Sequence, residues 1–492
     1  MIDTLSLMFQ NFIAMLQYDS TSPMLFSSGL FWTLFLIFLP IYSLLKDSRR
    51  KMITFVIVFS LYFYYKSSGF FFLLLVATSF IDWQISHFIY RSKEKKKKKL
   101  FAVLSIIISL SVLAYFKYAN FFVWNWSQII GSNFQPQDII LPVGISFYTF
   151  QSISYIVDVY KGHIQSTKTW LEYLFFLSFF PALVAGPIVR ADKFLPQLKA
   201  NKRVTYEDVY SGLWLIITGI IKKAIIADYI AQYNDLIFSN PTGYSGFESL
   251  MGIIGYTVQI YCDFSGYSDM AIGLALIMGF KLGDNFLLPY QSTNVTEFWR
   301  SWHISLSSWL RDYLYIPLGG NRKGTFRTYL NNFITMLIGG LWHGAAWKFV
   351  FWGGMHGIGL AVHKACKPIL KKIPDNIFTK SIFWFITISF VSLLWVFFRA
   401  DSFTDSVAVI SNVFVNFNVD HIIPFFKERY VWGIMVLIII ITHAIPLDYY
   451  KKISSLFVKS PWILKWIIFV IVVQFVIEFM GEDVAPFIYF QF

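Results

Sequence analysis

Residues 298–312 read FWRSWHISLSSWLRD, and residues 339–345 read GGLWHGA. Each stretch places one histidine, His303 or His343, inside a strongly apolar part of the chain. A polar, titratable side chain at membrane depth costs roughly 2.5–3.5 kcal/mol even on lenient insertion scales. A chain that keeps such groups there usually uses them for chemistry or transport. Residues 298–350 are therefore the predicted functional core.

The composition excludes an ordinary soluble protein. The 492 residues are 56% hydrophobic, 20% aromatic and only 14% charged, whereas soluble domains are about 25% charged. Apolar runs recur along the chain at 26–45, 52–66, 69–88, 100–116, 139–159, 209–231, 249–280, 329–350, 381–398, 431–446 and 462–480. One crossing takes about 20 apolar residues, so about 11 crossings are expected. The sequence predicts an all-α polytopic membrane protein.

The net charge of +13 is concentrated in short connections at 46–51, 91–99, 190–203, 322–327 and 364–372. Basic connections on the cytoplasmic side orient multi-pass proteins, and they also attract anionic lipid. This distribution indicates a multi-pass membrane protein and argues against nucleic-acid binding.

The chain ends and the cysteines add little. Cys262 and Cys366 form no framework, so neither a metal site nor a disulfide fold is predicted. The N-terminus has no basic n-region and no A-x-A cleavage site. Residues 1–22 are expected to form an interfacial helix, and 1–492 a single membrane domain.

Residues 174–190 are not expected to form a plain span. Pro181, Gly186 and Pro187 interrupt the apolar run, and an open backbone at membrane depth needs protein or a water-filled cavity around it. Flanking basic residues favour a re-entrant hairpin. The halves of the chain show no matching pair of broken helices, which weakens the interpretation as a secondary transporter.

Arg300, His303, Ser307 and Arg311 would share one face of a continuous helix. One interpretation is an interfacial helix whose arginines reach toward the membrane surface. The alternative is a cavity wall that positions an anionic or polyhydroxyl ligand.

His343 lies midway along 329–350, beside glycines that allow close backbone approach. It could simply form a hydrogen bond between helices. A neutral imidazole is also the natural general base for a hydroxyl at neutral pH. The sequence has no serine elbow, Cys–His pair or HExxH zinc pattern, so it offers a base without an obvious protein nucleophile.

Other polar motifs give weaker signals. Asp263 and Asp269 are intramembrane carboxylates six residues apart, which places them on different helix faces; pairing with an arginine or lysine is as plausible as chemistry. Lys222 and Lys223 lie inside an apolar run, so the orientation of residues from about 205 to 300 across the membrane stays open. The Gly-rich basic loop at 318–324 is a weak phosphate-binding signal and fits a plain cytoplasmic loop.

The 298–320 block and the GLWHGA stretch resemble the signature of the bacterial membrane-bound O-acyltransferase (MBOAT) family, in its AlgI-like branch of alginate and cell-surface polysaccharide O-acetylation. Further similar stretches are PVGISF at 142–147, AGP at 185–187 and YCDFSGY at 261–267. The resemblance implies a multi-pass protein of the bacterial inner membrane, with a ring of helices around a central funnel. It also implies transfer of an acyl group from a cytoplasmic thioester towards an extracytoplasmic acceptor.

The expected function is thus O-acetylation of a glycan such as an exopolysaccharide, with His343 as general base and His303 orienting the donor or stabilising developing charge. Acetyl-CoA is the expected donor substrate, with no bound cofactor or metal. An extracytoplasmic partner protein or the glycan would be the acceptor. The residues expected to bind substrate or donor are Arg300, Trp302, Ser307, Arg311, Asp312, Trp342 and Asp269.

Three alternatives remain open at this point. The donor could be a D-alanyl carrier protein and the acceptor teichoic acid. The chain could instead transport polysaccharide or lipid, with the histidines as a proton relay. It could also be a scaffold that docks a secreted transferase without catalysing.

Overall fold

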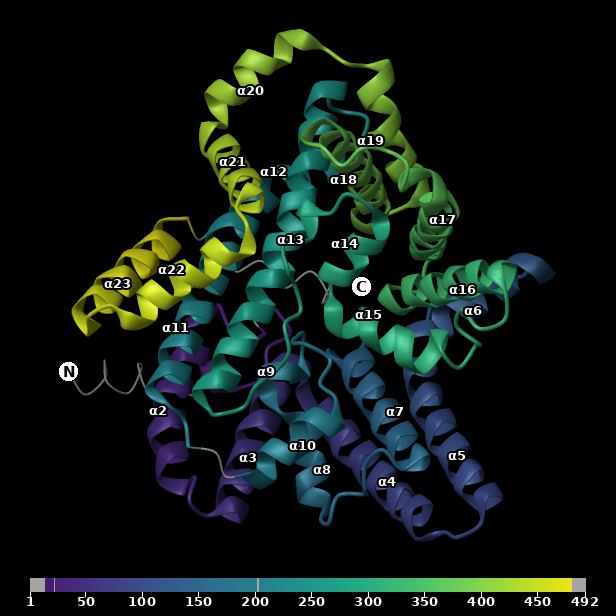
Figure 1. The fold of residues 1–492 in the computed structure, drawn as a ribbon, viewed down its shortest axis with the longest axis vertical. Helices are drawn as coiled ribbons and strands as arrows, with labels where there is room; N and C mark the ends of the chain where they lie inside the picture. Colours follow the sequence, from purple (N-terminus) through teal and green to yellow (C-terminus); the bar gives the residue numbers. More distant parts are fainter. Residues whose placement is uncertain (1–13, 22, 201–202, 480–492) are drawn as a thin grey trace. The chain divides into compact units, whose positions relative to one another are not determined.

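The computed structural model describes residues 14–21, 23–200 and 203–479. These described residues form helices and connecting loops, without a strand among them (Figure 1). The predicted all-α class is confirmed. Most of the expected interfacial helix at 1–22 lies outside the described residues. The chain divides into two compact units.

The first unit contains residues 1–205 together with Leu274–Leu282. Its helices are α2 (Gly29–Leu45), α3 (Arg49–Ser68), α4 (Phe72–Arg91), α5 (Lys95–Leu113), α6 (Ala119–Ile130), α7 (Ile145–Lys161), α8 (Trp170–Ser178), α9 (Phe180–Leu183) and α10 (Ala191–Ala200). Rings of Phe175, Phe179 and Phe194 hold Phe280 at centroid separations of 5.2–5.5 Å. This aromatic contact attaches 274–282 to the unit.

The predicted break near Pro181 is confirmed. α8 ends at Ser178, α9 is a short helix that ends at Leu183, and no helix forms again before Ala191. Residues 172–189 are buried throughout, so the open backbone lies against protein, as a non-helical segment at membrane depth requires.

The second unit contains Tyr206–Gly273 and Gly283–Phe492. Its helices are α11 (Tyr206–Ile220), α12 (Asp228–Ser239), α13 (Gly246–Ile277), α14 (Val295–Ser301), α15 (Ile304–Leu310), α16 (Thr325–His343), α17 (Trp347–Leu370), α18 (Ile377–Arg399), α19 (Phe403–Val415), α20 (Ile422–Glu428), α21 (Tyr430–Ala444), α22 (Leu447–Lys459) and α23 (Trp462–Phe479). A π-helical turn, Ile221–Ala227, joins α11 to α12, and a second one, Arg311–Tyr315, follows α15.

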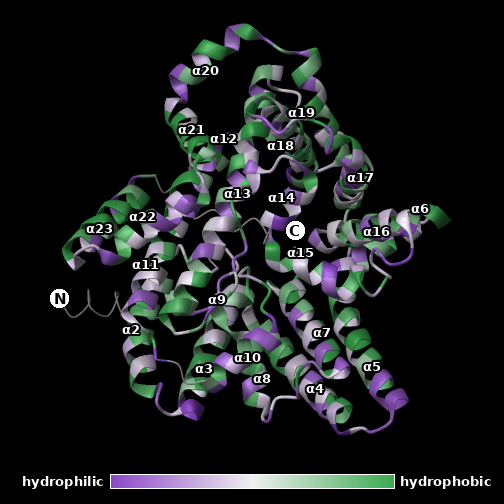
Figure 2. Ribbon diagram, in the orientation of Figure 1, coloured by the Kyte–Doolittle hydropathy of each residue, from purple (hydrophilic) through white to green (hydrophobic). Residues whose placement is uncertain are grey.

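Five helical stretches among the described residues are long and apolar enough to cross a membrane, or up to seven if each of two bent pairs is one span. The lysine run at the start of α5 forms the hydrophilic end of an otherwise apolar helix (Figure 2). The multi-pass character is therefore evident from the helices, and the expected count of about 11 crossings stays a prediction.

Candidate active site

The segment that carries the first histidine is not the continuous helix expected from its sequence. α14 ends at Ser301, Trp302 is extended, and His303 has a left-handed backbone with φ +41° before α15 begins. The prediction that positions 300, 303, 307 and 311 share one helical face is therefore wrong. Because the backbone turns at His303, the imidazole lies in the interior, whereas Arg300 lines an open pocket.

His303 is fully buried and contacts residues from two other segments. Its Nδ1 lies 3.1 Å from Oδ1 of Asn285, in the loop after α13. Its ring meets the Phe264 ring of α13 edge-on at 4.6 Å and the Trp342 ring of α16 at 6.3 Å. A left-handed conformation is uncommon for a residue with a side chain and is typical of sites that the surrounding structure holds in place.

His343 is the last residue of α16, and its position depends on glycine. At Gly340 an added Cβ would lie 2.2 Å from the carbonyl oxygen of Phe349, and at Gly353 it would lie 2.3 Å from that of Met336. Only glycine permits α16 and α17 to cross this closely. The crossing places the Trp352 ring 5.0 Å from the ring of His343, which is 4% exposed.

Six rings form a continuous sequence of neighbours that we name the histidine–tryptophan series: His303, Trp342, His343, Trp352, His356 and Trp299. Successive ring centroids lie 6.3, 4.9, 5.0, 4.7 and 5.1 Å apart. At its far end, Trp299 Nε1 donates a hydrogen bond to His356 Nδ1 at 3.2 Å. Trp342 thus contacts both histidines singled out from the sequence, and the structure brings these three residues together.

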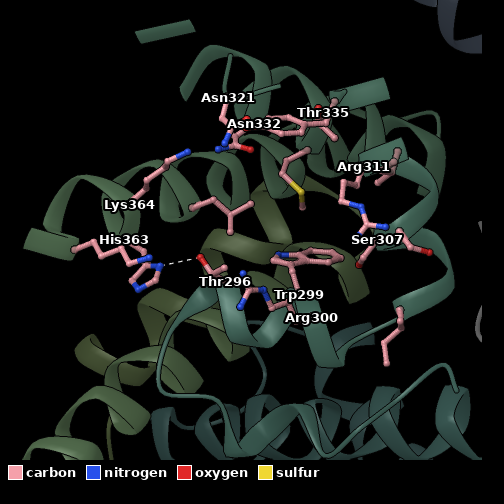
Figure 3. Close-up of a pocket in the computed structure, with 17 residues that line it drawn as sticks. Thr296, Trp299, Arg300, Ser307, Arg311, Asn321, Asn332, Thr335, His363 and Lys364 are labelled. Atoms are coloured by element: carbon pink, nitrogen blue, oxygen red, sulfur yellow. Dashed lines mark hydrogen bonds between the residues drawn. The ribbon is translucent and has the colours of Figure 1, made fainter. Parts of the chain in front are cut away.

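Trp299 also lines a pocket of about 690 Å³ (Figure 3). It is lined by Thr296, Trp299, Arg300, Ile304, Ser307, Ser308, Leu310, Arg311, Tyr315, Asn321, Asn332, Thr335, Met336, Leu360, His363, Lys364 and Lys367. Of the predicted binding residues, Arg300, Ser307 and Arg311 line it. We call it the basic pocket because Arg300, Arg311, Lys364 and Lys367 contribute cations from α14, from the π-helical turn after α15, and from α17.

Polar contacts organise the rim of the basic pocket. His363 Nδ1 lies 2.7 Å from Oγ1 of Thr296, which ties α17 to α14 (Figure 3). Arg311 donates to both carboxylate oxygens of Asp312, at 2.8 and 3.2 Å. Asp312 therefore offsets part of the charge of Arg311, and it is not one of the residues that line the pocket.

Two other predicted binding residues lie away from the basic pocket. Trp302 is buried and packs against the Trp395 ring at 4.9 Å. Asp269 forms an ion pair with Lys222. Next to it, Lys223 contacts Asp228 at 2.8 Å and Asp263 at 2.6 Å. The two intramembrane lysines and the two carboxylates of α13 thus pair with each other, which was the less reactive interpretation of the sequence.

Sequence reasoning missed several residues of the site. Four lining residues of α17 follow the spacing of one helix face: Leu360, His363, Lys364 and Lys367. In the sequence, however, the two lysines belong to a basic run that predicts a cytoplasmic connection. In the Gly-rich loop, Asn321 lines the pocket, and the basic residues after it do not. Nothing in the sequence marks Asn285. Among the described residues, no group of three His, Cys, Asp or Glu side chains is arranged to hold a metal ion.

Comparison with known proteins identifies the family. Residues 163–407 match the model of the membrane-bound O-acyltransferase family. The chain is 43% identical over 386 residues to the probable alginate O-acetylase AlgI of Pseudomonas aeruginosa, covering 77% of this chain and 72% of that protein. The chain belongs to the membrane-bound O-acyltransferase family. The family resemblance is confirmed, and this multi-pass membrane protein is an acyltransferase.

Two further relatives show the range of acceptors within the family. The peptidoglycan O-acetyltransferase of Helicobacter pylori is 39% identical over 351 residues, 66% of each chain. The teichoic acid D-alanyltransferase of Bacillus subtilis is 29% identical over 282 residues, 54% of this acyltransferase and 71% of that protein. The acyltransferase is thus more similar to O-acetylating relatives than to this D-alanylating one.

Proposed function

We propose that this acyltransferase moves an acetyl group from acetyl-CoA to a hydroxyl of a cell-surface glycan, or to a hydroxyl of an extracytoplasmic partner that completes the transfer. The relatives named for alginate and peptidoglycan O-acetylation support the acyl group and the class of acceptor. The observation that carries the proposal is that the histidine–tryptophan series, which contains His303 and His343, shares Trp299 with the basic pocket.

The basic pocket is the proposed site for the phosphates of CoA. Arginine binds phosphate oxygens through paired N–H donors, and lysine binds them as a point charge. Lys364 and Lys367 begin the basic stretch at 364–372, which the positive-inside pattern assigns to the cytoplasm. A cytoplasmic donor would therefore meet this pocket on its own side of the membrane.

His343 is the proposed general base. It would accept the proton of the attacking hydroxyl as the oxygen bonds to the thioester carbonyl carbon. The C–S bond then breaks, the thiolate leaves, and the proton passes from the imidazolium to give free CoA thiol. His303 is assigned to orienting the reacting groups from the other side of Trp342. The aromatic rings around His343 exclude water, which would otherwise compete as acyl acceptor.

D-alanyl transfer from a carrier protein to teichoic acid remains the second candidate because of the Bacillus subtilis relative. Both donors carry a phosphopantetheine arm, but CoA has two further phosphates, one that completes its pyrophosphate and one on its ribose. The several cations of the basic pocket match the larger phosphate content of CoA.

Purified protein in sealed vesicles tests the proposal. Acetyl-labelled acetyl-CoA is supplied on the face that carries residues 364–372, and CoA release and labelled hydroxyl acceptor are followed. We expect both with wild-type protein and neither with a folded His343→Ala variant. Transfer that requires a charged D-alanyl carrier and ignores acetyl-CoA would instead establish the second candidate. Flux of glycan without acyl transfer would indicate transport.

A further inference from the structure

Asn285 is a buried residue that contacts the imidazole of His303. It lies in the loop between α13 and α14 and is 1% exposed. Its backbone oxygen accepts a hydrogen bond from the Ile304 N–H at 2.9 Å, directly after His303. The same residue therefore contacts both the backbone turn at His303 and the imidazole itself.

The orientation of the Asn285 amide is fixed by its neighbours. The backbone N–H of Ser305 points at Oδ1 at 3.2 Å, and the Ser305 hydroxyl donates to the same atom at 2.8 Å. A backbone N–H can only donate, so the atom facing it is the amide oxygen and not the nitrogen. The amide nitrogen, on its other side, donates to Oγ of Ser268 at 3.0 Å.

An amide oxygen only accepts hydrogen bonds, and Nδ1 of His303 lies 3.1 Å from it. The Ser305 hydroxyl also lies 3.4 Å from Nδ1, but it donates to Oδ1 of Asn285 at the shorter distance of 2.8 Å. With the hydroxyl proton directed at Oδ1, Nδ1 of a neutral imidazole carries the ring proton and Nε2 carries the lone pair. His356 is arranged in the opposite way, because the Trp299 indole N–H donates to its Nδ1. The heavy-atom contacts of the two buried histidines therefore fit opposite neutral tautomers.

We infer that Asn285 is a positioning residue that holds His303 in the Nδ1–H tautomer, so that Nε2 acts as a hydrogen-bond acceptor or base towards the reacting groups. This inference rests on the proposed function for the involvement of His303 in transfer. It separates two roles that the sequence left open. A neutral His303 that stabilised an oxyanion would need its proton on Nε2, whereas orienting a substrate N–H or O–H needs the lone pair there.

The direct test is nitrogen-15 NMR of histidine-labelled protein in bilayers, with the His303 signals assigned by their loss in a His303→Gln variant. We expect a protonated Nδ1 and an unprotonated Nε2 for His303, and the reverse for His356 as an internal reference. An Nε2–H tautomer at His303 in the wild-type protein would overturn the inference, whatever the activity.

Variants of Asn285 test whether the His303 tautomer affects the rate of acetyl transfer. Asn285→Leu removes the acceptor, and we expect the acetyl transfer rate to fall at least about 100-fold, in the range of a lost acid–base contribution, with loss of the single tautomer. Asn285→Asp restores an acceptor oxygen, so it should recover the Nδ1–H tautomer and stay within about 10-fold of wild type. Ser268→Ala, which leaves Oδ1 in place, is the matched control and should change the rate only a few-fold.

The outcomes distinguish the two levels of the proposal. If His303→Gln transfers acetyl at the wild-type rate, the assigned role of His303 fails, and the NMR result on Asn285 still stands or falls by itself. If Asn285→Leu keeps both the tautomer and the rate, the positioning role fails alone. If Asn285→Asp is folded but no better than Asn285→Leu, the acceptor oxygen is not what matters, and the inference is also overturned.

Discussion

The histidine–tryptophan series and the basic pocket adjoin at Trp299, yet they have opposite electrostatic character. In the series, His303, His343 and His356 are buried among aromatic rings. In the basic pocket, Arg300 and Lys364 are largely exposed to solvent. A base that takes a proton must start uncharged, whereas a phosphate site must be charged and is cheaper to keep hydrated. The fold would therefore keep the proposed donor binding and the proposed chemistry in neighbouring but separate regions.

The largest expected effect separates two histidines within the same series. His343→Gln should lower the kcat of acetyl transfer by about 10²- to 10⁴-fold, the usual contribution of a general base. His356→Gln replaces an equally buried imidazole and should stay within about 10-fold. Steady-state kinetics on folded, detergent-purified variants measures both. Equal losses would mean that buried imidazoles support packing here and that His343 is not the base.

Removing cations from the basic pocket should act on binding instead of chemistry. Arg300→Gln and Lys364→Gln should each raise the KM for acetyl-CoA about 5- to 10-fold and leave kcat nearly unchanged, since each removes a solvent-screened contact to phosphate. Lys380→Gln, which removes a cation from an exposed ion pair with Asp375 outside the pocket, is the matched control. A fall in kcat with unchanged KM would contradict the proposed separation of donor binding from chemistry.

Ionic strength should sharpen the same distinction with a smaller effect. Exposed charges are screened over about 10 Å at 0.1 M salt and over about 3 Å at 1 M. We therefore expect the KM for acetyl-CoA to rise about 3-fold between these concentrations of sodium chloride. The kcat should not follow it, because the proposed proton transfer takes place among buried rings. Parallel loss of kcat would place charged, solvent-exposed groups in the chemical step.

Trp299→Phe should have the smallest effect, although Trp299 is shared by both regions. Phenylalanine keeps an aromatic ring but loses the N–H that donates to His356. We expect the free energy of unfolding to fall by about 1 kcal/mol, the net value of one hydrogen bond, and kcat/KM to stay within about 3-fold. Thermal unfolding in detergent, compared with a Trp462→Phe variant at an exposed position, checks this. A 100-fold loss of kcat would mean that Trp299 belongs to the chemical step.

The helical class and the break near Pro181 could be predicted from the sequence, because hydropathy and Pro/Gly placement are local signals. The catalytic roles of His303 and His343 stay predictions. Sequence reasoning could not find the turn at His303. The apolar pattern around that residue fits a continuous helix. The left-handed backbone is held by contacts with Asn285, whose backbone oxygen accepts from the Ile304 N–H and whose Oδ1 faces His303 Nδ1. Helical periodicity therefore wrongly placed positions 300, 303, 307 and 311 on one face of a helix.

The basic pocket also could not be predicted from the local sequence. Lys364 and Lys367 carry a sequence signal, but the signal for a cytoplasmic loop and that for a phosphate site are both a run of cations. Only the packing of α17 beside α14, with Thr296 and His363 in contact, distinguishes them. The role of Asp269 was ambiguous for a related reason, because its partner Lys222 lies on another helix.

The π-helical turn at Ile221–Ala227 has a consequence for biosynthesis. A π-turn bonds residues five apart, so Lys223 and Asp228 face each other within one segment and can neutralise each other as soon as that segment is made. Lys222 has its partner, Asp269, on α13, which the ribosome produces later. The translocon thus receives a hydrophobic segment with one lysine already compensated and one not. We therefore expect integration of Tyr206–Ser239 to become more favourable once α13 has been made.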